Sequence, residues 1–510
     1  MTAQTTRLPD DRNGLPRARP LRPPSGRSTS VAVTLIPAAV MLALGAWQLD
    51  RGMWWDEITT YEASTRSLGD LWRLLHTVDG VHGLYYLLMH SFLPRGEGDA
   101  VLLRLPSVVG MALAVAGTAA IGRRLAGPAV GVLAGLVLAV SPLASHYAQE
   151  GRSYALVTAA VVLASLLFLR ALERPSLARW AGYVAFLLLA TALHLFAVLV
   201  LLAHGVCLLV IRSPRKIACR WMAAALVVSA VVLPYALSVR RQAGQVSRLE
   251  PPTWKNVAGL ALEFTGPGVV AAIAVSALVF TGIQGPVVVR AFALTWLVVP
   301  PGALMAYSFV QPAYHPRYVV HALPAVALLA AVGLDAAARA GAAILTRCRS
   351  EADTGRLASG CGFTLVACLL ALQMPGQLVE RGAGSRNDDQ TAAARLIGAH
   401  AQRGDAMVFV PGTKRGVEYV YPRDFSKVSD VLLIETPTAS GTLTGREAPV
   451  GEVRRLLIVH DRIWAIDRSG VAPDPTPAGR AKARVLRDEY RVVWAQSVTG
   501  LRVSLHVRNR

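Results

Sequence analysis

The stretch VAVTLIPAAVMLALGAWQL, residues 31–49, contains no charged side chain, and MWWDEITTYEA, residues 53–63, follows shortly after it. An apolar run of this length is sufficient for a helix that crosses a bilayer. Basic residues before an apolar run would also fit a signal peptide, but this run is long and no convincing cleavage site follows it. The sequence therefore favours an uncleaved anchor, with the adjacent carboxylates Asp56 and Glu57 placed where the chain leaves the membrane.

Further apolar runs make the chain a polytopic α-helical membrane protein with about eleven transmembrane helices. These runs cover residues 105–121, 127–144, 154–169, 180–193, 195–211, 221–239, 264–283, 291–310, 318–335 and 357–375. Of the 510 residues, 53% are hydrophobic and only 16% are charged, whereas about 25% are charged in a typical soluble protein. Residues 31–377 are therefore predicted to form a transmembrane domain, after a disordered, Arg- and Pro-rich cytoplasmic tail at residues 1–30.

The distribution of charge predicts the orientation. The net charge is +20, but no basic stripe interleaves with aromatic residues, which argues against nucleic acid as a partner. Lys and Arg instead collect in alternate gaps between the apolar runs, as they do in cytoplasmic loops. We therefore predict a multi-pass protein of the cytoplasmic (plasma) membrane, with its N-terminus inside and the loop 50–104 and the C-terminus outside. The five cysteines show neither metal-binding spacing nor a disulfide framework.

The composition changes after the last apolar run, and residues 378–510 are predicted to form a small extracytoplasmic α/β domain. NDDQTAAARLIGAHAQRGD, residues 387–405, is typical of a helix capped by Asn387 or Asp388. AMVFV, DVLLIE, RRLLIVH and YRVVWA are predicted strands. In the first outer loop, residues 67–77 and 82–93 are amphipathic and predict helices lying in the membrane interface, with Tyr85 and Tyr86 as aromatic anchors.

Two acidic motifs of the first outer loop could carry chemistry. Asp56 could cap a helix running from Glu57 toward Arg66, or could face a reaction centre. Because neighbours one apart on a helix point in different directions, at most one of the pair is expected to face such a centre. Asp79 and Gly80 form a turn signal, and His82 follows it. Asp79 and His82 could hold an acceptor, bind a metal or orient Asp56.

Two later motifs place charges beside predicted spans. SHYAQEGRSYAL, residues 145–156, contains Tyr147, Glu150 and Arg152, and charges next to hydrocarbon usually line a cavity or path. Arg317 and Tyr318 lie at the mouth of a later span, where a guanidinium could clamp a lipid-borne phosphate or snorkel to headgroups.

Two further residues are more ambiguous. Arg104 is open to the same two interpretations as Arg317. His194, between two short spans, could be either a supporting site residue or a satisfied interior histidine. Together the boundary residues predict one outward-facing polar site that suits a polyprenyl-phosphate sugar, because such a substrate has a charged head at the surface and a tail in lipid.

The order of these motifs resembles that of GT-C class membrane glycosyltransferases, close to the family 39 group of bacterial mannosyltransferase-like proteins. More distantly it is similar to protein O-mannosyltransferases and to lipid A aminoarabinose transferases. The matching pieces, between residues 31 and 335, are WWDE (54–57), DGVHGLYYLL (79–88), RLPS (104–107), GRRLAG (122–127), SPLASHYAQEGRSYAL (141–156) and PRYVVHALPAVALL (316–329).

The resemblance implies roles for particular residues. Asp56 would be the general base and Glu57 would complete the acidic pair, while Arg152 and Arg317 would lie near the donor phosphate. Asp79 and His82 match the second motif of the first outer loop. The family often has two prolines after this histidine, where this chain has Gly83 and Leu84.

The expected activity is transfer, with inversion, of a mannose-like hexose or a pentose from a polyprenyl-phosphate donor to an acceptor hydroxyl at the outer face. The acceptor could be a protein, a lipid or a cell-envelope glycan. A divalent cation, Mg²⁺ or Mn²⁺, could bind at Asp56, Asp79 and His82, although their spacing is not a metal signature. A transporter or flippase, which would place charges deep in the spans, and a ligase using a diphosphate-linked donor are the alternatives.

Overall fold

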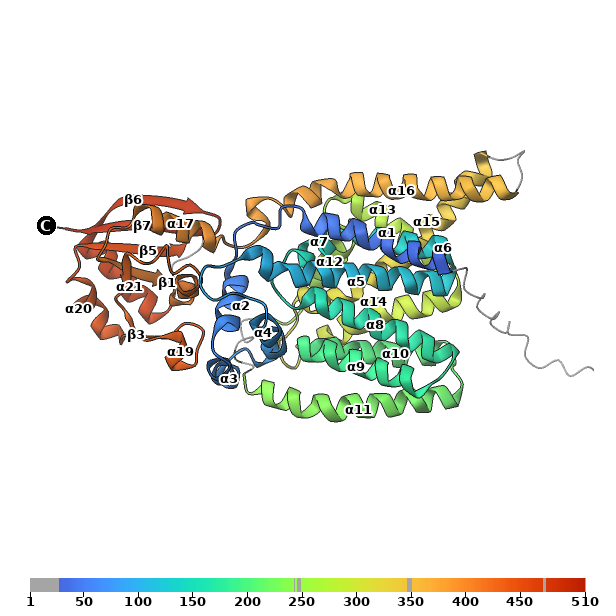
Figure 1. The fold of residues 1–510 in the computed structure, drawn as a ribbon, viewed down its shortest axis with the longest axis horizontal. Coiled ribbons are helices and arrows are strands. Elements are labelled where there is room, and N and C mark those ends of the chain that lie inside the picture. Colours follow the sequence, from blue (N-terminus) through green and yellow to red (C-terminus); the bar gives the residue numbers. More distant parts are fainter. Residues whose placement is uncertain (1–26, 243, 245–248, 346–350, 471–473, 510) are drawn as a thin grey trace, which may run out of the picture.

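The computed structural model describes residues 27–509, apart from 243, 245–248, 346–350 and 471–473. Most of the predicted N-terminal tail, residues 1–26, lies outside the described residues, and the first helix begins at Arg27. Figure 1 shows an elongated molecule with a helical bundle at one end and a sheet-containing C-terminal region at the other.

Every predicted apolar run forms helix in the bundle. The helices, most of them side by side along the long axis (Figure 1), are α1 (Arg27–Ala46), α5 (Ala100–Ala126), α6 (Pro128–Val140), α7 (Pro142–Ala148), α8 (Tyr154–Glu173), α9 (Leu177–Leu193), η2 (Leu195–Val198), α10 (Leu199–Val210), α11 (Arg215–Arg240), α12 (Trp254–Thr265), α13 (Val269–Ile283), α14 (Val287–Ser308), η4 (Pro316–Ala322), α15 (Leu323–Leu345) and α16 (Glu351–Val379).

Length and composition separate these helices into three groups. Within the described residues, six helices are individually long and apolar enough to cross a membrane. Two pairs qualify only together because they bend, α6 with α7 by 67° and α12 with α13 by 87°. Pro142 begins α7 directly after the first bend, and it has no amide proton to continue the helix of α6. The segments Val31–Ala46, Leu177–Leu193 and Leu195–Val210 are apolar but shorter.

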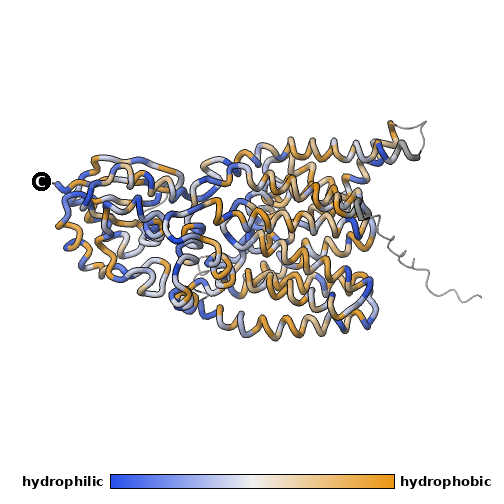
Figure 2. The backbone as a smooth tube through the Cα atoms, in the orientation of Figure 1, coloured by the Kyte–Doolittle hydropathy of each residue, from blue (hydrophilic) through white to orange (hydrophobic). Residues whose placement is uncertain are grey.

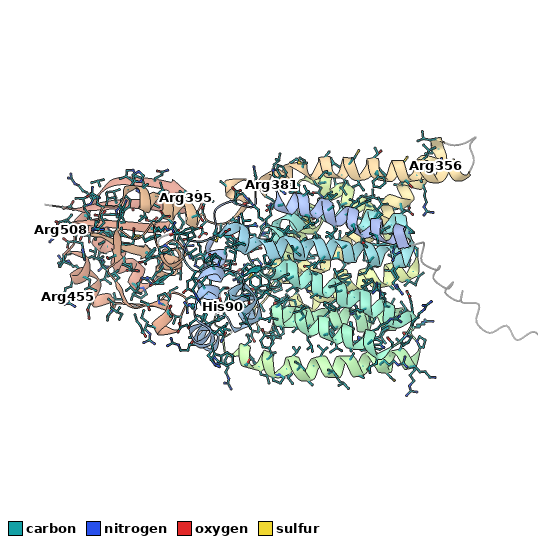
Figure 3. All side chains as sticks on the ribbon, in the orientation of Figure 1. His90, Arg356, Arg381, Arg395, Arg455 and Arg508 are labelled. Carbon is teal, nitrogen blue, oxygen red and sulfur yellow. The ribbon has the colours of Figure 1, made fainter. Side chains whose placement is uncertain are left out.

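Burial distinguishes central from peripheral helices. The apolar window of the span containing η4 and α15 is 89% buried, whereas those of α11 and α16 are only 22% buried. A helix that is apolar all round must be covered either by other helices or by lipid, so α15 forms the centre and α11 and α16 the edge. Figure 2 shows hydrophobic residues along the bundle and a more polar junction with the C-terminal region. α16 runs from the far end, near Arg356, back to that junction at Arg381 (Figure 3).

The first loop forms the junction between the two parts (Figure 1). It contains α2 (Trp55–Thr65), α3 (Leu68–Thr77), η1 (Gly80–His82) and α4 (Gly83–His90). The predicted amphipathic segments thus form α3 and α4. The predicted anchoring role of Tyr85 and Tyr86 is wrong, because both side chains are fully buried.

The C-terminal region is an α/β unit around a five-stranded sheet, with strand order β2-β1-β5-β7-β6. Strands β2, β1 and β5 are parallel, and β7 and β6 continue antiparallel. Its elements are η5 (Ala383–Ser385), α17 (Gln390–His400), β1 (Asp405–Val410), η6 (Gly412–Arg415), α18 (Gly416–Val420), β2 (Val428–Asp430), β3 (Leu433–Glu435), α19 (Pro437–Ser440), β4 (Arg446–Glu447), η7 (Val450–Glu452), α20 (Val453–Leu457), β5 (Arg462–Arg468), α21 (Pro477–Glu489), β6 (Tyr490–Val498) and β7 (Leu501–Arg508).

Several local predictions for this region need correction. RRLLIVH is not a strand but contributes to α20, in which Val453 and Leu457 are both buried and share one helix face because they are four residues apart. DVLLIE is divided between β2 and β3, and β5 and β7 were not predicted. The cap of α17 is Asp389, which accepts a hydrogen bond from the amide of Ala392, instead of Asn387 or Asp388.

Candidate active site

Asp56 and Glu57 both lie in the first turn of α2 and point to different sides of it. α2 begins at Trp55 and Trp54 occupies the cap position, so of the two alternatives for Asp56 the N-cap is excluded. Asp56 is 6% exposed and Glu57 is fully buried. Adjacent helical residues diverge in direction, and the two carboxylates consequently have different partners.

Glu57 forms a buried ion pair with Arg104 of α5. The Arg104 guanidinium donates to both Glu57 carboxylate oxygens, at 2.7 and 2.6 Å, and to the carbonyls of Leu49, Arg51 and Gly52. Burial alone would raise the pKa of Glu57, but Arg104 holds it below its usual value. Glu57 was expected to complete a catalytic acidic pair, and Arg104 either to bind a phosphate or to reach the headgroups. In the structure the two side chains face each other, with Arg104 only 1% exposed.

A glycine makes room for this ion pair. The amide of Gly151 donates to Glu57 Oε1 at 2.8 Å. A β-carbon at position 151 would lie 2.5 Å from Leu103 Cγ, much closer than a side chain tolerates. The Gly-Arg order of residues 151–152 therefore lets the backbone reach Glu57 while the next side chain points toward Asp56.

Asp56 faces two guanidinium groups from distant parts of the sequence. Its Oδ2 accepts a hydrogen bond from Arg317 Nη1 at 2.8 Å, and Arg152 Nε lies 3.9 Å from the same oxygen. Arg317 comes from η4 and keeps 26% of its side chain exposed, whereas Arg152 is 7% exposed. The three residues that were predicted as base and phosphate ligands are thus brought together.

The second loop motif joins the same group through Arg152. Arg152 Nη2 contacts His82 Nε2 at 3.0 Å, and Tyr86 donates to Asp79 Oδ2 at 2.8 Å. Burial and the charge of Arg152 lower the pKa of His82 well below its usual value. A neutral imidazole can accept the hydrogen bond from Arg152. Asp79 is linked to the same arginine through Tyr86, whose hydroxyl accepts from Arg152 Nη1 at 3.5 Å.

Thr60 completes the contacts of Arg152. Its hydroxyl accepts from Arg152 Nη1 at 3.1 Å, and it was missed in the sequence. Its position four residues after Asp56 was an available signal, because residues four apart share a helix face.

Aromatic side chains surround Arg317. Its guanidinium carbon lies 5.6 Å from the Tyr318 ring centre and 6.0 Å from that of Tyr154. His194 connects these two rings, at 4.7 Å from Tyr318 and 5.6 Å from Tyr154, and Tyr147 packs against Tyr154 at 5.5 Å. Tyr318, His194 and Tyr147, which were predicted to lie near the site, thus form one aromatic group beside Arg317 together with Tyr154, which was not singled out.

Glu150 lies beside this group. It is 2% exposed, burial raises its pKa, and the nearest ion-pair partner is His146 at 3.9 Å. His146 pairs in turn with Glu380 at the end of α16, at 2.6 Å. Glu150 therefore belongs to the side of the site that joins the bundle to the C-terminal region.

The residues considered for a metal do not fit one. Among the described residues, no group of three or more His, Cys, Asp or Glu side chains could hold a metal ion. Asp56 and His82 each face a guanidinium group, and a cation placed between them would be repelled by Arg152. The positive charge of the site is supplied by Arg152 and Arg317.

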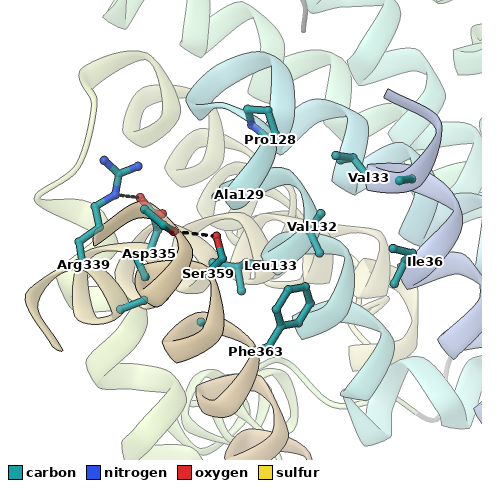
Figure 4. Close-up of a pocket in the computed structure, with 15 residues that line it drawn as sticks. Val33, Ile36, Pro128, Ala129, Val132, Leu133, Asp335, Arg339, Ser359 and Phe363 are labelled. Atoms are coloured by element: carbon teal, nitrogen blue, oxygen red, sulfur yellow. Dashed lines mark hydrogen bonds and ion pairs between the residues drawn. The ribbon is translucent and has the colours of Figure 1, made fainter. Parts of the chain in front are cut away.

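A cavity of about 820 Å³ lies elsewhere, between α1, α6, α15 and α16. Figure 4 shows that its lining is mainly apolar, with the Asp335–Arg339 ion pair on one side. None of the predicted site residues lines it. Its position and chemistry separate it from the charged group around Asp56.

Comparisons with known proteins identify the fold class of the chain. A family model described as dolichyl-phosphate-mannose-protein mannosyltransferase matches residues 79–237. That range contains Asp79, His82 and Arg152 but neither Asp56 nor Arg317. No curated protein matches the chain.

Among solved structures, ArnT from Cupriavidus metallidurans bound to undecaprenyl phosphate has a TM-score of 0.54 and 14% identity, over 93% of this chain and 98% of that chain. The chain has the GT-C fold. The apo structure of ArnT gives the same TM-score at 13% identity, over 92% and 97% of the two chains. Arabinosyltransferase EmbB from Mycobacterium smegmatis matches less well, with a TM-score of 0.40 and 15% identity, over 73% of this chain and 43% of that chain.

The GT-C fold and the apolar helices confirm the predicted class of polytopic membrane protein with a small C-terminal sheet domain. They also confirm the resemblance that the order of motifs indicated. The orientation of the two ends across the membrane stays a prediction.

Replacing Glu57 with Ala should lower the free energy of unfolding by about 3–5 kcal/mol, because Arg104 would stay buried without its counter-charge. Thermal unfolding in detergent measures the effect. Glu97→Gln is the control, since its partner Arg423 has an 87% exposed side chain and such pairs contribute about 0–1 kcal/mol. Equal losses in the two variants would contradict the structural role of Glu57.

The lowered pKa of His82 predicts a pH dependence of stability. The unfolded chain takes up a proton at His82 near pH 6.5, whereas the folded chain resists it. The contribution of His82 is therefore complete above about pH 6.5 and decreases below it, by roughly 1.4 kcal/mol per pH unit until the folded pKa is reached. Unfolding temperatures between about pH 7 and pH 5 should fall less steeply for His82→Gln than for the parent chain; identical slopes would refute the assignment.

Proposed function

We propose that this chain is a membrane glycosyltransferase that moves a sugar from a polyprenyl-phosphate donor to an acceptor hydroxyl. The observation that carries the proposal is the convergence of Asp56 with Arg152 and Arg317. A carboxylate can take a proton from a hydroxyl, and guanidinium groups match the oxygens of a phosphate. The fold shared with ArnT, whose structure contains undecaprenyl phosphate, supports a donor of this class.

In the resting chain, Arg317 is directed at Asp56 and retains part of its exposure. A donor phosphate would compete with Asp56 for this guanidinium, because charge-assisted hydrogen bonds to phosphate are strong and can be bidentate. Arrival of the donor would then release the carboxylate for its role as base. Arg152 would remain in place through its contacts with Thr60 and His82.

The reaction would be a single displacement with inversion. Asp56 takes the proton of the acceptor hydroxyl while the acceptor oxygen bonds to the anomeric carbon of the sugar. The bond from that carbon to the phosphate oxygen breaks at the same time. The electron pair goes to the leaving polyprenyl phosphate, which gains a negative charge. Arg152 and Arg317 stabilise that charge where it develops, the task that fixed cationic donors perform in such sites.

The finer features of the proposal follow from the sequence. The distribution of Lys and Arg supports a site at the outer face of the cytoplasmic membrane, with the C-terminal domain outside. The donor sugar would be a mannose-like hexose or a pentose, and the description of the family model that matches residues 79–237 supports the hexose. The acceptor would be a hydroxyl of a protein, a lipid or a cell-envelope glycan.

Charge placement favours this enzyme over a transporter or flippase. The paired acids and arginines gather at one end of the bundle, whereas a transporter would be expected to bind its substrate near the midplane at broken helices. A ligase would use a diphosphate donor. Parallel assays with undecaprenyl-phosphate and undecaprenyl-diphosphate sugars separate the proposed transferase from such a ligase.

Asp56→Asn should reduce transfer by at least about 10²-fold, because the amide cannot accept the proton. The assay measures release of undecaprenyl phosphate from a panel of its hexose and pentose derivatives by membranes containing the full chain. Asp70→Asn, on the exposed side of α3 in the same loop, is the matched control and should retain activity. Near-normal turnover by Asp56→Asn, or no turnover of any donor by the parent chain, would overturn the proposal.

A further inference from the structure

The segment that leads into α2 is held by the C-terminal domain. The amide of Met53 donates to Thr391 Oγ1 at 2.8 Å, and the Met53 carbonyl accepts from the amide of Gln390 at 3.0 Å. A β-carbon at Gly52 would lie 2.2 Å from Asp389 Oδ1. The chain entering α2 therefore lies directly against the first turn of α17, with no space for a larger residue at position 52.

Asp388 supplies the hydrogen-bond partner that α2 lacks within its own sequence. The first amides of a helix have no acceptor inside that helix, and Trp54 at the cap position offers no side-chain cap. Asp388 Oδ1 accepts from the amide of Trp55 at 2.9 Å across 333 positions of sequence. A carboxylate at this end also complements the positive end of the helix dipole.

The carboxylate of Asp388 is itself fixed on its other side. Its Oδ2 pairs with Lys414 and accepts from Gln390 Nε2 at 2.9 Å. Asp388 and Lys414 are 5% and 7% exposed. Trp55 is held a second time, since its indole Nε1 donates to the carbonyl of Thr413 at 2.9 Å.

The contacts with Trp55 from Thr413, and with Asp388 from Lys414, come from the carboxyl end of strand β1 in the α/β domain. Thr413 and Lys414 belong to η6, which directly follows β1, and β1 lies between the parallel strands β2 and β5. In open α/β sheets, ligands bind outside the carboxyl ends of parallel strands. In this chain the segment at the carboxyl end of β1 instead contacts Trp55, the residue immediately before Asp56.

We infer that Asp388, held by Lys414, is a positioning residue for Asp56, so that the C-terminal domain sets the place of the catalytic carboxylate. The inference rests on the proposed function. Asp56 follows the anchored amide by one residue, whereas Arg152 and Arg317 belong to the bundle. Displacement of Trp55 would move the base relative to the donor site, and a shift of about 1 Å can cost roughly 10²-fold in rate.

The test compares Asp388→Ala with two other variants of the full chain in detergent. Asp388→Asn retains an acceptor for the Trp55 amide. Asp405→Ala removes a buried carboxylate from the opposite end of β1, where it accepts from Arg462 and Trp464, and it leaves α2 untouched. Amide hydrogen exchange of the peptide covering residues 53–58 is measured together with turnover of the undecaprenyl-phosphate sugar that the parent chain uses.

Asp388→Ala should speed exchange in this peptide and lower kcat by about tenfold or more, with the KM for donor changed less than about threefold. Asp388→Asn should recover most of the slow exchange and most of kcat. Asp405→Ala should lower thermal stability while keeping kcat and the exchange rate of residues 53–58. Unchanged exchange and kcat in Asp388→Ala, or an equal loss of kcat in Asp405→Ala, would overturn the inference. Active Asp56→Asn would instead overturn the proposed function, while the exchange result would still report on the anchoring of α2.

Discussion

The buried ion pair between Glu57 and Arg104 determines how the paired acids can be used. Both charges are removed from water, which is costly unless each is matched and hydrogen-bonded, and here the guanidinium also reaches three backbone carbonyls. This satisfies Glu57 completely and fixes the rotation of α2 about its axis. Asp56 must then point to the other side, where it meets Arg152 and Arg317.

A second consequence is that the proposed site is assembled from segments remote in sequence. Asp56 comes from the first loop, Arg152 from the break between α7 and α8, and Arg317 from the start of the η4–α15 span. Each lies in the first turn of a helix or just before it, at α2, α8 and η4 respectively. One carboxylate thus faces two guanidinium groups, and a phosphate would meet this excess of positive charge and change the pairing without requiring a new charged group.

Much of the fold could be predicted because hydrophobic length and charge bias act locally in a membrane protein. Each apolar run had to satisfy its own backbone hydrogen bonds as helix, and the predicted runs did so. Local strand prediction was less successful: the apolar spacing of RRLLIVH fits a strand, yet burial at Val453 and Leu457 selects a helix. Short apolar stretches are ambiguous in this way because the packing that chooses between the two periods is tertiary.

The site could be predicted in its charges but not in its pairings. Asp56, Arg152 and Arg317 were recognisable because charged groups at a membrane boundary need a reason to be there. The sequence could not show that Arg104 would take Glu57, since the partners are 47 residues apart. Trp55 and Asp388 are 333 positions apart, so nearly all of the membrane domain lies between them in the sequence. No local pattern could indicate their contact.

The most direct measurement is a structure of the full chain in a lipid nanodisc with undecaprenyl phosphate bound. The phosphate is expected within hydrogen-bond distance of Arg152 and Arg317, with Arg317 moved from Asp56 and the Glu57–Arg104 pair unchanged. A phosphate bound away from both arginines, or one held by Arg104 after its separation from Glu57, would contradict this expectation.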